Sequence, residues 1–210
     1  LVGSEMCIRD RCEAMQSNCM YEIARKVSEQ KRRIILISGP SSAGKTTLSH
    51  RLSIQLRAMG LRPHAIAADN YFVNREDNPK DENGNYDFEC LEAMDLETLN
   101  RDMTRLLDGE EIELPVFNFK TGVREYHGDL LKIGENDVII MEGIHSLNPK
   151  MTYGLADEDK YKIYISPLNQ LYVEGEDGEP AKVSTIDSRL LRRIVRDSRT
   201  RGNDVEKTLS

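Results

Sequence analysis

The sequence predicts an α/β fold in which helices flank a mostly parallel sheet. Short apolar runs of the kind that form buried parallel strands occur at 34–37, 64–68, 138–141 and 161–165. Helical hydrophobic spacing lies between several of these runs, and a glycine-rich loop joins the first run to the helix that follows it. Strand, loop, helix and strand in this order form a βαβ unit, from which parallel sheets are built.

The composition limits the classes of protein to which this chain can belong. The chain has 210 residues, of which 39% are hydrophobic, and this suits one domain with a sizeable core. Its net charge of -7 argues against a nucleic-acid partner, and no apolar run is long enough to predict a membrane span. The cysteines, Cys7, Cys12, Cys19 and Cys90, show no C-x-x-C spacing, so we expect free thiols in the cytoplasm.

The two ends of the chain are interpreted separately from its main part. Residues 1–11 resemble a translated sequencing adapter, and we exclude them from the fold. Residues 12–32 predict a lead-in helix, because apolar residues recur there at helical spacing. Residues 33–210 form the main domain, which we expect to be incomplete at its C-terminus because the chain stops soon after the last predicted helix.

The remaining elements follow from local signals. Gly60 ends the helix after the glycine-rich loop, and Asp108-Gly109 stops the next one. In chain order we expect a strand at 64–68 reaching Asp69, a helix at 95–107, a hairpin of strands at 112–119 and 124–127, a strand at 138–141 ending at Glu142, a strand at 161–165, an exposed loop at 174–179 and a helix at 186–201.

The glycine-rich loop is Gly39-Pro40-Ser41-Ser42-Ala43-Gly44-Lys45-Thr46, followed by Thr47. It follows an apolar strand and opens a helix, which is the context of a phosphate-binding P-loop. Its glycines let backbone N–H groups surround phosphate oxygens, Lys45 can reach the β- and γ-phosphates, and Thr46 can bind Mg²⁺. A plain turn that needs glycine is the alternative, but it does not explain Lys45 and Thr46. We therefore predict a P-loop NTPase fold that binds a nucleoside triphosphate, either ATP or GTP, together with Mg²⁺.

Two acidic residues stand at the ends of predicted strands. Asp69 follows one strand and Glu142 ends another, at the sheet edge where ligands bind in open α/β folds. Either could hold the metal or its water, and either could instead cap a turn. His145 follows Glu142 closely and could approach phosphate or substrate, or serve as a cap.

The last predicted helix is rich in arginine. Arg189, Arg192, Arg193 and Arg196 recur three or four residues apart, so several share a face and could clamp phosphates. A solvated charged helix is the alternative. We favour the clamp because we identify no acidic partners spaced to neutralise these arginines.

Several ordered motifs resemble the uridine kinase and phosphoribulokinase family of P-loop kinases. More narrowly, they resemble the bacterial nucleoside-kinase domain found behind a threonyl-tRNA-synthetase-like region. The resemblance covers about residues 32 to 209. It rests on Gly39 to Thr46, Asp69-Asn70-Tyr71-Phe72, Tyr86-Asp87-Phe88-Glu89, Leu114-Pro115-Val116-Phe117-Asn118-Phe119, Glu142-Gly143-Ile144-His145 and Arg189-Leu190-Leu191-Arg192-Arg193-Ile194-Val195-Arg196-Asp197.

The resemblance implies roles for residues. Asp69 is implied as the general base at the acceptor hydroxyl, and Thr46 with Glu142 as the metal ligands. The arginine helix resembles the family's lid, with Arg189 and Arg192 acting in transfer and Arg193 and Arg196 binding the nucleotide. The implied acceptor contacts are Asp69, Tyr71, Phe88, Glu89, Phe117 and Arg124. A small β-hairpin and helical lobe would hold the acceptor.

The departures from the family pattern concern the acceptor. Phe117 stands where uridine kinases have a base-contacting tyrosine, and Gly122 stands where they have a histidine. Losing these partners matters because specificity depends on pairing buried polar groups. We expect a nucleoside kinase that is similar to uridine kinase. A phosphoribulokinase-like sugar kinase and a non-catalytic nucleotide-binding regulatory module stay open, as does a homo-oligomer.

Overall fold

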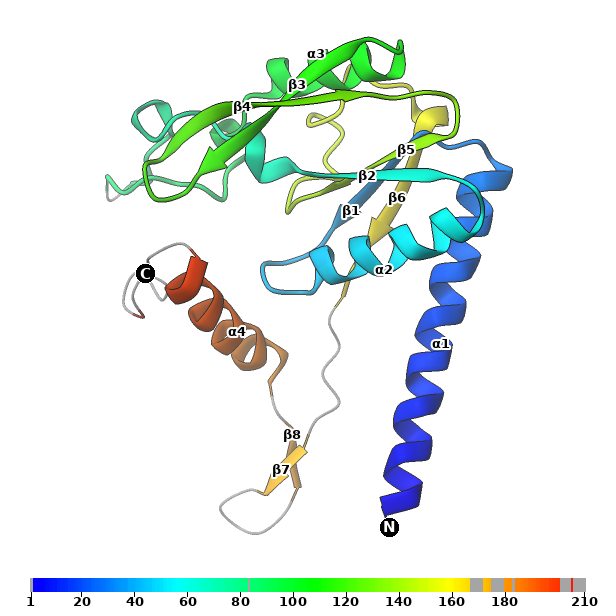
Figure 1. The fold of residues 1–210 in the computed structure, drawn as a ribbon. Coiled ribbons are helices and arrows are strands. Elements are labelled where there is room, and N and C mark those ends of the chain that lie inside the picture. The colour runs from blue at the N-terminus through cyan, green and yellow to red at the C-terminus, as the bar shows by residue number, and fades with distance from the viewer. Residues whose placement is uncertain are drawn as a thin grey trace.

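A four-stranded parallel sheet lies at the centre of the protein, which is described by a computed structural model over residues 2–82, 84–166, 172–174, 180–182, 184–200 and 205 (Figure 1). Its strand order is β2-β5-β1-β6, and all the pairings are parallel. The strands are β1 (Ile34–Ser38), β2 (Arg62–Ala67), β5 (Asp137–Glu142) and β6 (Lys160–Tyr164). The expected α/β fold with a mostly parallel sheet is confirmed.

Two helices cover one face of the sheet. They are α1 (Val2–Glu29) and α2 (Lys45–Ala58), and they pack against buried aliphatic residues of β1 and β5. On α1, Ala24 and Val27 of the second half enter this cluster. The helix begins at Val2 rather than Cys12, and in Figure 1 its N-terminal half extends away from the sheet. The separation of residues 1–11 from the domain stays a prediction.

The opposite face is covered by the small lobe expected from the sequence. It contains α3 (Leu96–Leu107), β3 (Glu111–Asn118), β4 (Val123–Lys132) and the short 3-10 helices η1 (Ala68–Tyr71), η2 (Arg75–Asp77) and η3 (Leu91–Ala93). The side chain of Asp95 caps α3 by accepting from the Thr98 amide at 2.9 Å. β4 is longer than expected because it pairs along the length of β3, across a register shift next to Pro115.

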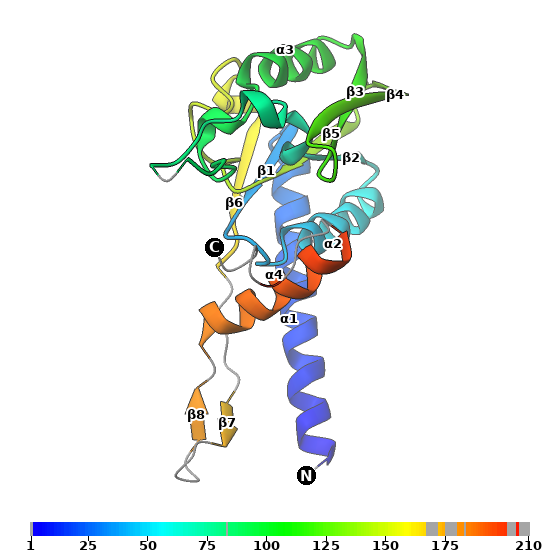
Figure 2. The same cartoon turned by 90° about the vertical axis from the view of Figure 1, so that its left-hand side faces the viewer.

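The C-terminal part carries the expected arginine-rich helix. After the 3-10 turn η4 (Asp157–Asp159) and β6 come the antiparallel strands β7 (Tyr172–Glu174) and β8 (Pro180–Lys182), then α4 (Thr185–Thr200). The loop expected at 174–179 lies outside the described residues, except for Glu174 in β7. Figure 2 shows α4 crossing near the start of α2. Within the described ranges, none of the helices has both the length and the apolar character needed to cross a bilayer.

Candidate active site

The strand register brings the expected acidic residues toward the phosphate loop. Glu142 at the end of β5 is paired with Ile37 of β1 on one side and with Ala67 of β2 on the other. The loop leaves β1 directly after this row. Asp69 lies two residues beyond Ala67, in η1 rather than in the strand, because the chain turns at Ala68. The carboxyl ends of three neighbouring strands therefore supply the site.

The phosphate loop has the backbone geometry of an anion cradle. Ser42 and Gly44 adopt left-handed conformations, with φ of 59° and 98°, and such residues turn successive N–H groups inward toward an anion. A Cβ on Gly39 would lie 2.7 Å from the carbonyl oxygen of Ile165, after β6, so the close approach requires glycine. The ammonium of Lys45 donates to the carbonyls of Gly39 (2.9 Å) and Pro40 (3.2 Å).

A hydroxyl and a carboxylate meet beside this loop. Thr46 at the start of α2 donates its hydroxyl to Oε1 of Glu142 at 2.5 Å. Both groups offer oxygen atoms, which Mg²⁺ prefers, and Mg²⁺ is commonly bound by one or two carboxylates together with substrate phosphates. The residues present therefore fit a magnesium ion.

The charged groups around Lys45 come from three elements, β5, η1 and α4. Burial lowers the pKa of Lys45, while the nearby carboxylates of Glu142 and Asp69 act to raise it. Arg196 and Arg189 of α4 lower it further. The structure thus brings together, around one ammonium group, both expected acids and two of the expected lid arginines.

Helix α4 contacts the phosphate loop directly. Arg189 donates from Nε to the carbonyl oxygen of Ser41 at 3.2 Å, and Arg196 donates from Nη2 to its hydroxyl at 3.3 Å. The expectation that this helix lacks acidic partners is wrong. Asp197 is buried and pairs with Arg196, its neighbour in sequence, at 2.8 Å. It also pairs at 3.6 Å with Arg193, which lies four residues earlier on the same helix face.

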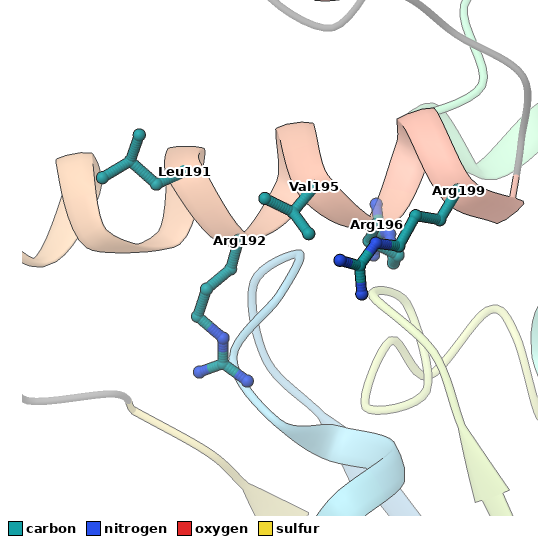
Figure 3. Close-up of a pocket in the computed structure, with 5 residues that line it drawn as sticks. All are labelled: Leu191, Arg192, Val195, Arg196 and Arg199. Carbon is teal, nitrogen blue, oxygen red and sulfur yellow. The ribbon is translucent and has the colours of Figure 1, made fainter.

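The α4 arginines that the sequence assigned to a lid do not all face the same way. Arg193 pairs through Nη1 with Oε1 of Glu89 at 3.3 Å, so it reaches the small lobe. In Figure 3, Arg192 projects on the side of the phosphate loop, whereas Leu191 projects away from it.

A shallow open pocket of about 440 Å³ is lined by α4 alone, through Leu191, Arg192, Val195, Arg196 and Arg199. Converging polar groups, rather than this pocket, define the candidate site.

The expected acceptor residues fall into two environments. Phe117 is 4% exposed and packs at 5.5 Å from Phe72 and 5.2 Å from Phe119, measured between ring centroids, and Phe88 lies 6.2 Å from Phe72. Tyr71 is fully buried in the same core, and burial raises the pKa of its phenol. Asp69 is half-buried and Glu89 is exposed, so these two are accessible.

Two further positions of the hairpin are occupied by structural contacts. Gly122 is buried with a φ of 75°, and a Cβ there would lie 2.7 Å from Nε of Arg75. A larger side chain therefore does not fit at Gly122. Arg124 donates from Nη2 to Asp95 at 2.9 Å and so ties the hairpin to the start of α3.

Sequence reasoning left the role of His145 open between a substrate contact and a cap, and it missed Asp197. His145 Nε2 lies 2.7 Å from the backbone carbonyl of Glu89 and links the segment after β5 to the small lobe. Asp197 was part of a recognised motif but received no role. Its spacing of four residues from Arg193 was a signal available in the sequence.

Comparisons with known proteins agree with this geometry. Residues 34–174 match the model of the phosphoribulokinase / uridine kinase family. A uridine kinase of Halobacterium salinarum is 30% identical over 170 residues, which cover 81% of this chain and 64% of that protein. A uridine kinase of Ligilactobacillus salivarius is 29% identical, over 86% of this chain and 74% of that protein.

Solved structures show the same fold. A candidate fructose transport system kinase from Silicibacter sp. superposes with a TM-score of 0.60 at 20% identity, over 90% of this chain and 86% of that one. A candidate uridine kinase from Bacillus stearothermophilus superposes with a TM-score of 0.50 at 25% identity, over 63% of this chain and 70% of that one.

Proposed function

The chain belongs to the phosphoribulokinase / uridine kinase family, and from this premise we propose that it uses ATP and Mg²⁺ to phosphorylate a hydroxyl group of a nucleoside. The observation that carries the proposal is the 2.5 Å contact between Thr46 and Glu142. It joins the loop helix to a carboxylate of the neighbouring strand, beside a lysine aimed into the phosphate loop. This combination is what P-loop phosphoryl transfer requires.

Each group has a role in the proposed reaction. The backbone of Gly39–Thr46, together with Thr47 and Lys45, holds the triphosphate. Thr46 and Glu142 would hold Mg²⁺, which supplies neutralisation of charge on the phosphate oxygens. Arg189, Arg192, Arg193 and Arg196 add positive charge from the lid helix.

The transfer is an in-line displacement. The acceptor hydroxyl oxygen bonds to the γ-phosphorus while the bond from that phosphorus to the β–γ bridging oxygen breaks, and ADP leaves. Asp69 orients the hydroxyl and takes its proton, since a carboxylate within hydrogen-bond reach can do so. Glu89 and Phe88 lie on the acceptor side, and Tyr71, Phe117 and Arg124 shape it from within or beside the lobe core.

A sugar acceptor is the second candidate, and the hairpin favours it. Phe117 offers no polar group, and the space at Gly122 is filled by Arg75. A nucleoside base would therefore find no hydrogen-bonding side chain at these two positions. A phosphoribulokinase-like kinase acts on a sugar phosphate and does not need side chains that hydrogen-bond to a base.

The family resemblance extends the proposal beyond the catalytic site. We propose that the complete gene product carries a threonyl-tRNA-synthetase-like region before the kinase domain, that residues 1–11 derive from a sequencing adapter, and that the protein works in the cytoplasm. Sequencing the intact locus tests the first two statements. A nucleotide-binding regulatory module is the remaining alternative, and it predicts tight ATP binding without turnover.

The decisive experiment measures phosphate transfer from ATP to a panel of nucleosides and sugar phosphates. We expect turnover with one class, and we expect Lys45→Ala and Asp69→Ala each to lower kcat by about 10²-fold or more, because charge stabilisation or proton transfer is lost. Asp129→Ala, an exposed acid on β4, is the control and should behave like the unaltered chain. Full activity in Asp69→Ala would remove Asp69 from the reaction.

A further inference from the structure

The buried acid of the lid helix has no role in the chemistry described above. The side chain of Asp197 is 3% exposed, although it belongs to a helix whose other acid, Asp187, is exposed. A carboxylate loses its hydration on burial and is tolerated there only when it is paired and hydrogen-bonded. Asp197 meets this condition through arginines of its own helix.

The pairing differs for the two arginines. Nε of Arg196 donates to Oδ1 of Asp197 at 2.8 Å, and Nη2 of the same guanidinium lies 2.8 Å from the same oxygen. Arg193 approaches the other oxygen, Oδ2, at 3.6 Å, which is ion-pair range but beyond a hydrogen bond. The carboxylate therefore orients Arg196 firmly and Arg193 loosely.

The two arginines point from this carboxylate to different parts of the site. Arg196 continues to the hydroxyl of Ser41 in the phosphate loop at 3.3 Å. Arg193 continues to the carboxylate of Glu89 at 3.3 Å, on the segment that His145 holds. The buried charge of Asp197 thus lies between two arginine contacts, one to the phosphate loop and one to the small lobe.

The local charge gives a reason for this arrangement. Burial is the main cause of the lowered pKa of Lys45, and the charges of Arg196 and Arg189 lower it further. Like charges repel and would spread long, flexible side chains unless an anion draws them together. A fixed carboxylate reduces the number of arginine conformations before any phosphate is bound, and such preorganisation raises affinity.

We propose that Asp197 is a positioning residue: it aims Arg196 at the bound triphosphate and keeps Arg193 within reach of the acceptor lobe. This role rests on the proposed function, since it assumes that a triphosphate occupies the loop. Asp197 itself does not contact the substrates. Its contribution is to the orientation of groups that do.

The test is a double-mutant cycle. For each variant, calorimetry measures the affinity for ATP under conditions without turnover. Asp197→Asn keeps the shape of the side chain and removes its charge, and Asp187→Asn on the same helix is the matched control. We expect Asp197→Asn to weaken ATP binding about tenfold, which is within the range for coupled charged neighbours. The affinity of Asp197→Asn for AMP, which lacks the β- and γ-phosphates, should fall about twofold or less.

The cycle separates positioning from general damage to the fold. Arg196→Gln should weaken ATP binding about tenfold in the unaltered chain but only about twofold in the Asp197→Asn background. The coupling between Arg193→Gln and Asp197→Asn in ATP affinity should be weaker than that of Arg196→Gln, because the contact of Arg193 with Asp197 is looser. Asp197→Glu, which retains the charge but moves it, provides a second variant should the Asn form fail to fold, and we expect it to weaken ATP binding more than AMP binding.

Three results would overturn the assignment. They are an ATP affinity of Asp197→Asn equal to that of Asp187→Asn, equal losses for ATP and AMP, and additive effects of Asp197→Asn and Arg196→Gln. Failure of the unaltered chain to bind ATP is a different result. It contradicts the proposed function and the assignment together, and it is visible before any variant is compared.

Discussion

At the scale of single residues, two glycines set how closely the candidate site is assembled. Gly39 brings the phosphate loop against the end of β6, and Gly143 brings the segment after Glu142 against η1. A Cβ on Gly143 would lie 2.7 Å from Cβ of Ala68, next to Asp69, and Ala68 is too short to move aside by rotation. The distance between the two acids of the site therefore depends on the absence of a side chain at Gly143.

Replacing this glycine tests the dependence. We expect Gly143→Ala to lower the free energy of unfolding by about 1–3 kcal/mol, as overpacking does, and to lower kcat because Asp69 shifts relative to Glu142. Urea denaturation and steady-state kinetics measure the two effects. Gly134→Ala is the control, since its Cβ would meet only side-chain ends, at 3.3 Å and 3.6 Å. Equal stability and activity of the two variants would contradict the packing argument.

A second residue, Asp137 at the start of β5, links stability to pH. Burial alone would raise its pKa, but hydrogen bonds from His64 at 2.8 Å and the Gly134 amide at 2.7 Å, with the charge of Arg62, lower the pKa below its ordinary value. A lowered folded-state pKa contributes stability above the unfolded value of about 3.9, and this stability is lost as pH falls through the folded pKa.

We therefore expect the unaltered chain to lose stability as pH falls below about 5, and Asp137→Asn to lose less over the same range. At pH 7 the variant should be less stable by about 1–3 kcal/mol, because hydrogen bonds to a charged, buried group are removed. Urea denaturation across this pH range measures both. Asp157→Asn is the control, since that carboxylate is 81% exposed and solvent screens its pairing with lysines. If the free energy of unfolding of Asp137→Asn depended on pH as steeply as that of the unaltered chain, other groups would cause the acid sensitivity.

At the scale of elements, α1 has two halves with different roles. Met20, Ala24 and Val27 are buried, whereas Met15 is 63% exposed. The helix therefore joins the core over its last three turns, as the hydrophobic spacing of the sequence predicted. The preceding turns continue the helical backbone, and a hydrogen bond that Nη1 of Arg51 donates to Oε1 of Gln16 at 3.1 Å joins one of them to α2.

This division gives a matched pair of variants. Ala24→Asp places a charge in the layer between α1, α2 and the sheet and should lower the free energy of unfolding by about 3 kcal/mol or more. Met15→Asp and removal of residues 1–11 should change it by about 0.5 kcal/mol or less. Urea denaturation compares the three. A large loss on removing residues 1–11 would show that they belong to the domain.

At the scale of the whole molecule, the candidate site is shared by parts of the chain that are far apart in sequence. The phosphate loop supplies Lys45, and η1, the end of β5 and α4 each supply a charged group near it. A ligand that contacts all of them would join the sheet, the small lobe and α4. Ligand binding to the folded state alone also stabilises that state by mass action.

We expect a non-hydrolysable ATP analogue with Mg²⁺ to raise the free energy of unfolding by about 2.7 kcal/mol at a concentration a hundred times its Kd. Thermal unfolding with increasing ligand measures the effect. Lys45→Ala should show a much smaller rise, because it removes the cation that binds the phosphates. An equal rise in both would place the nucleotide elsewhere.

The sequence by itself determined the features that depend on neighbouring residues. The phosphate loop, the buried strands, the capped helix α3 and the arginine-rich helix were predicted because their signals lie within a few residues of one another. The family was predicted for the same reason, since its motifs are short ordered blocks. The boundaries of elements depend on more distant contacts, and the length of β4 was underestimated because it depends on pairing with β3.

Only the tertiary structure decided which of these residues meet. The strand order places Glu142 beside Thr46, the turn at Ala68 removes Asp69 from its strand, and Arg75 fills the space at Gly122. Packing also determined that Tyr71 lies in the core and that Asp197 is buried. Contacts between residues far apart in sequence depend on strand register and on how the layers pack, and local patterns carry little information about either.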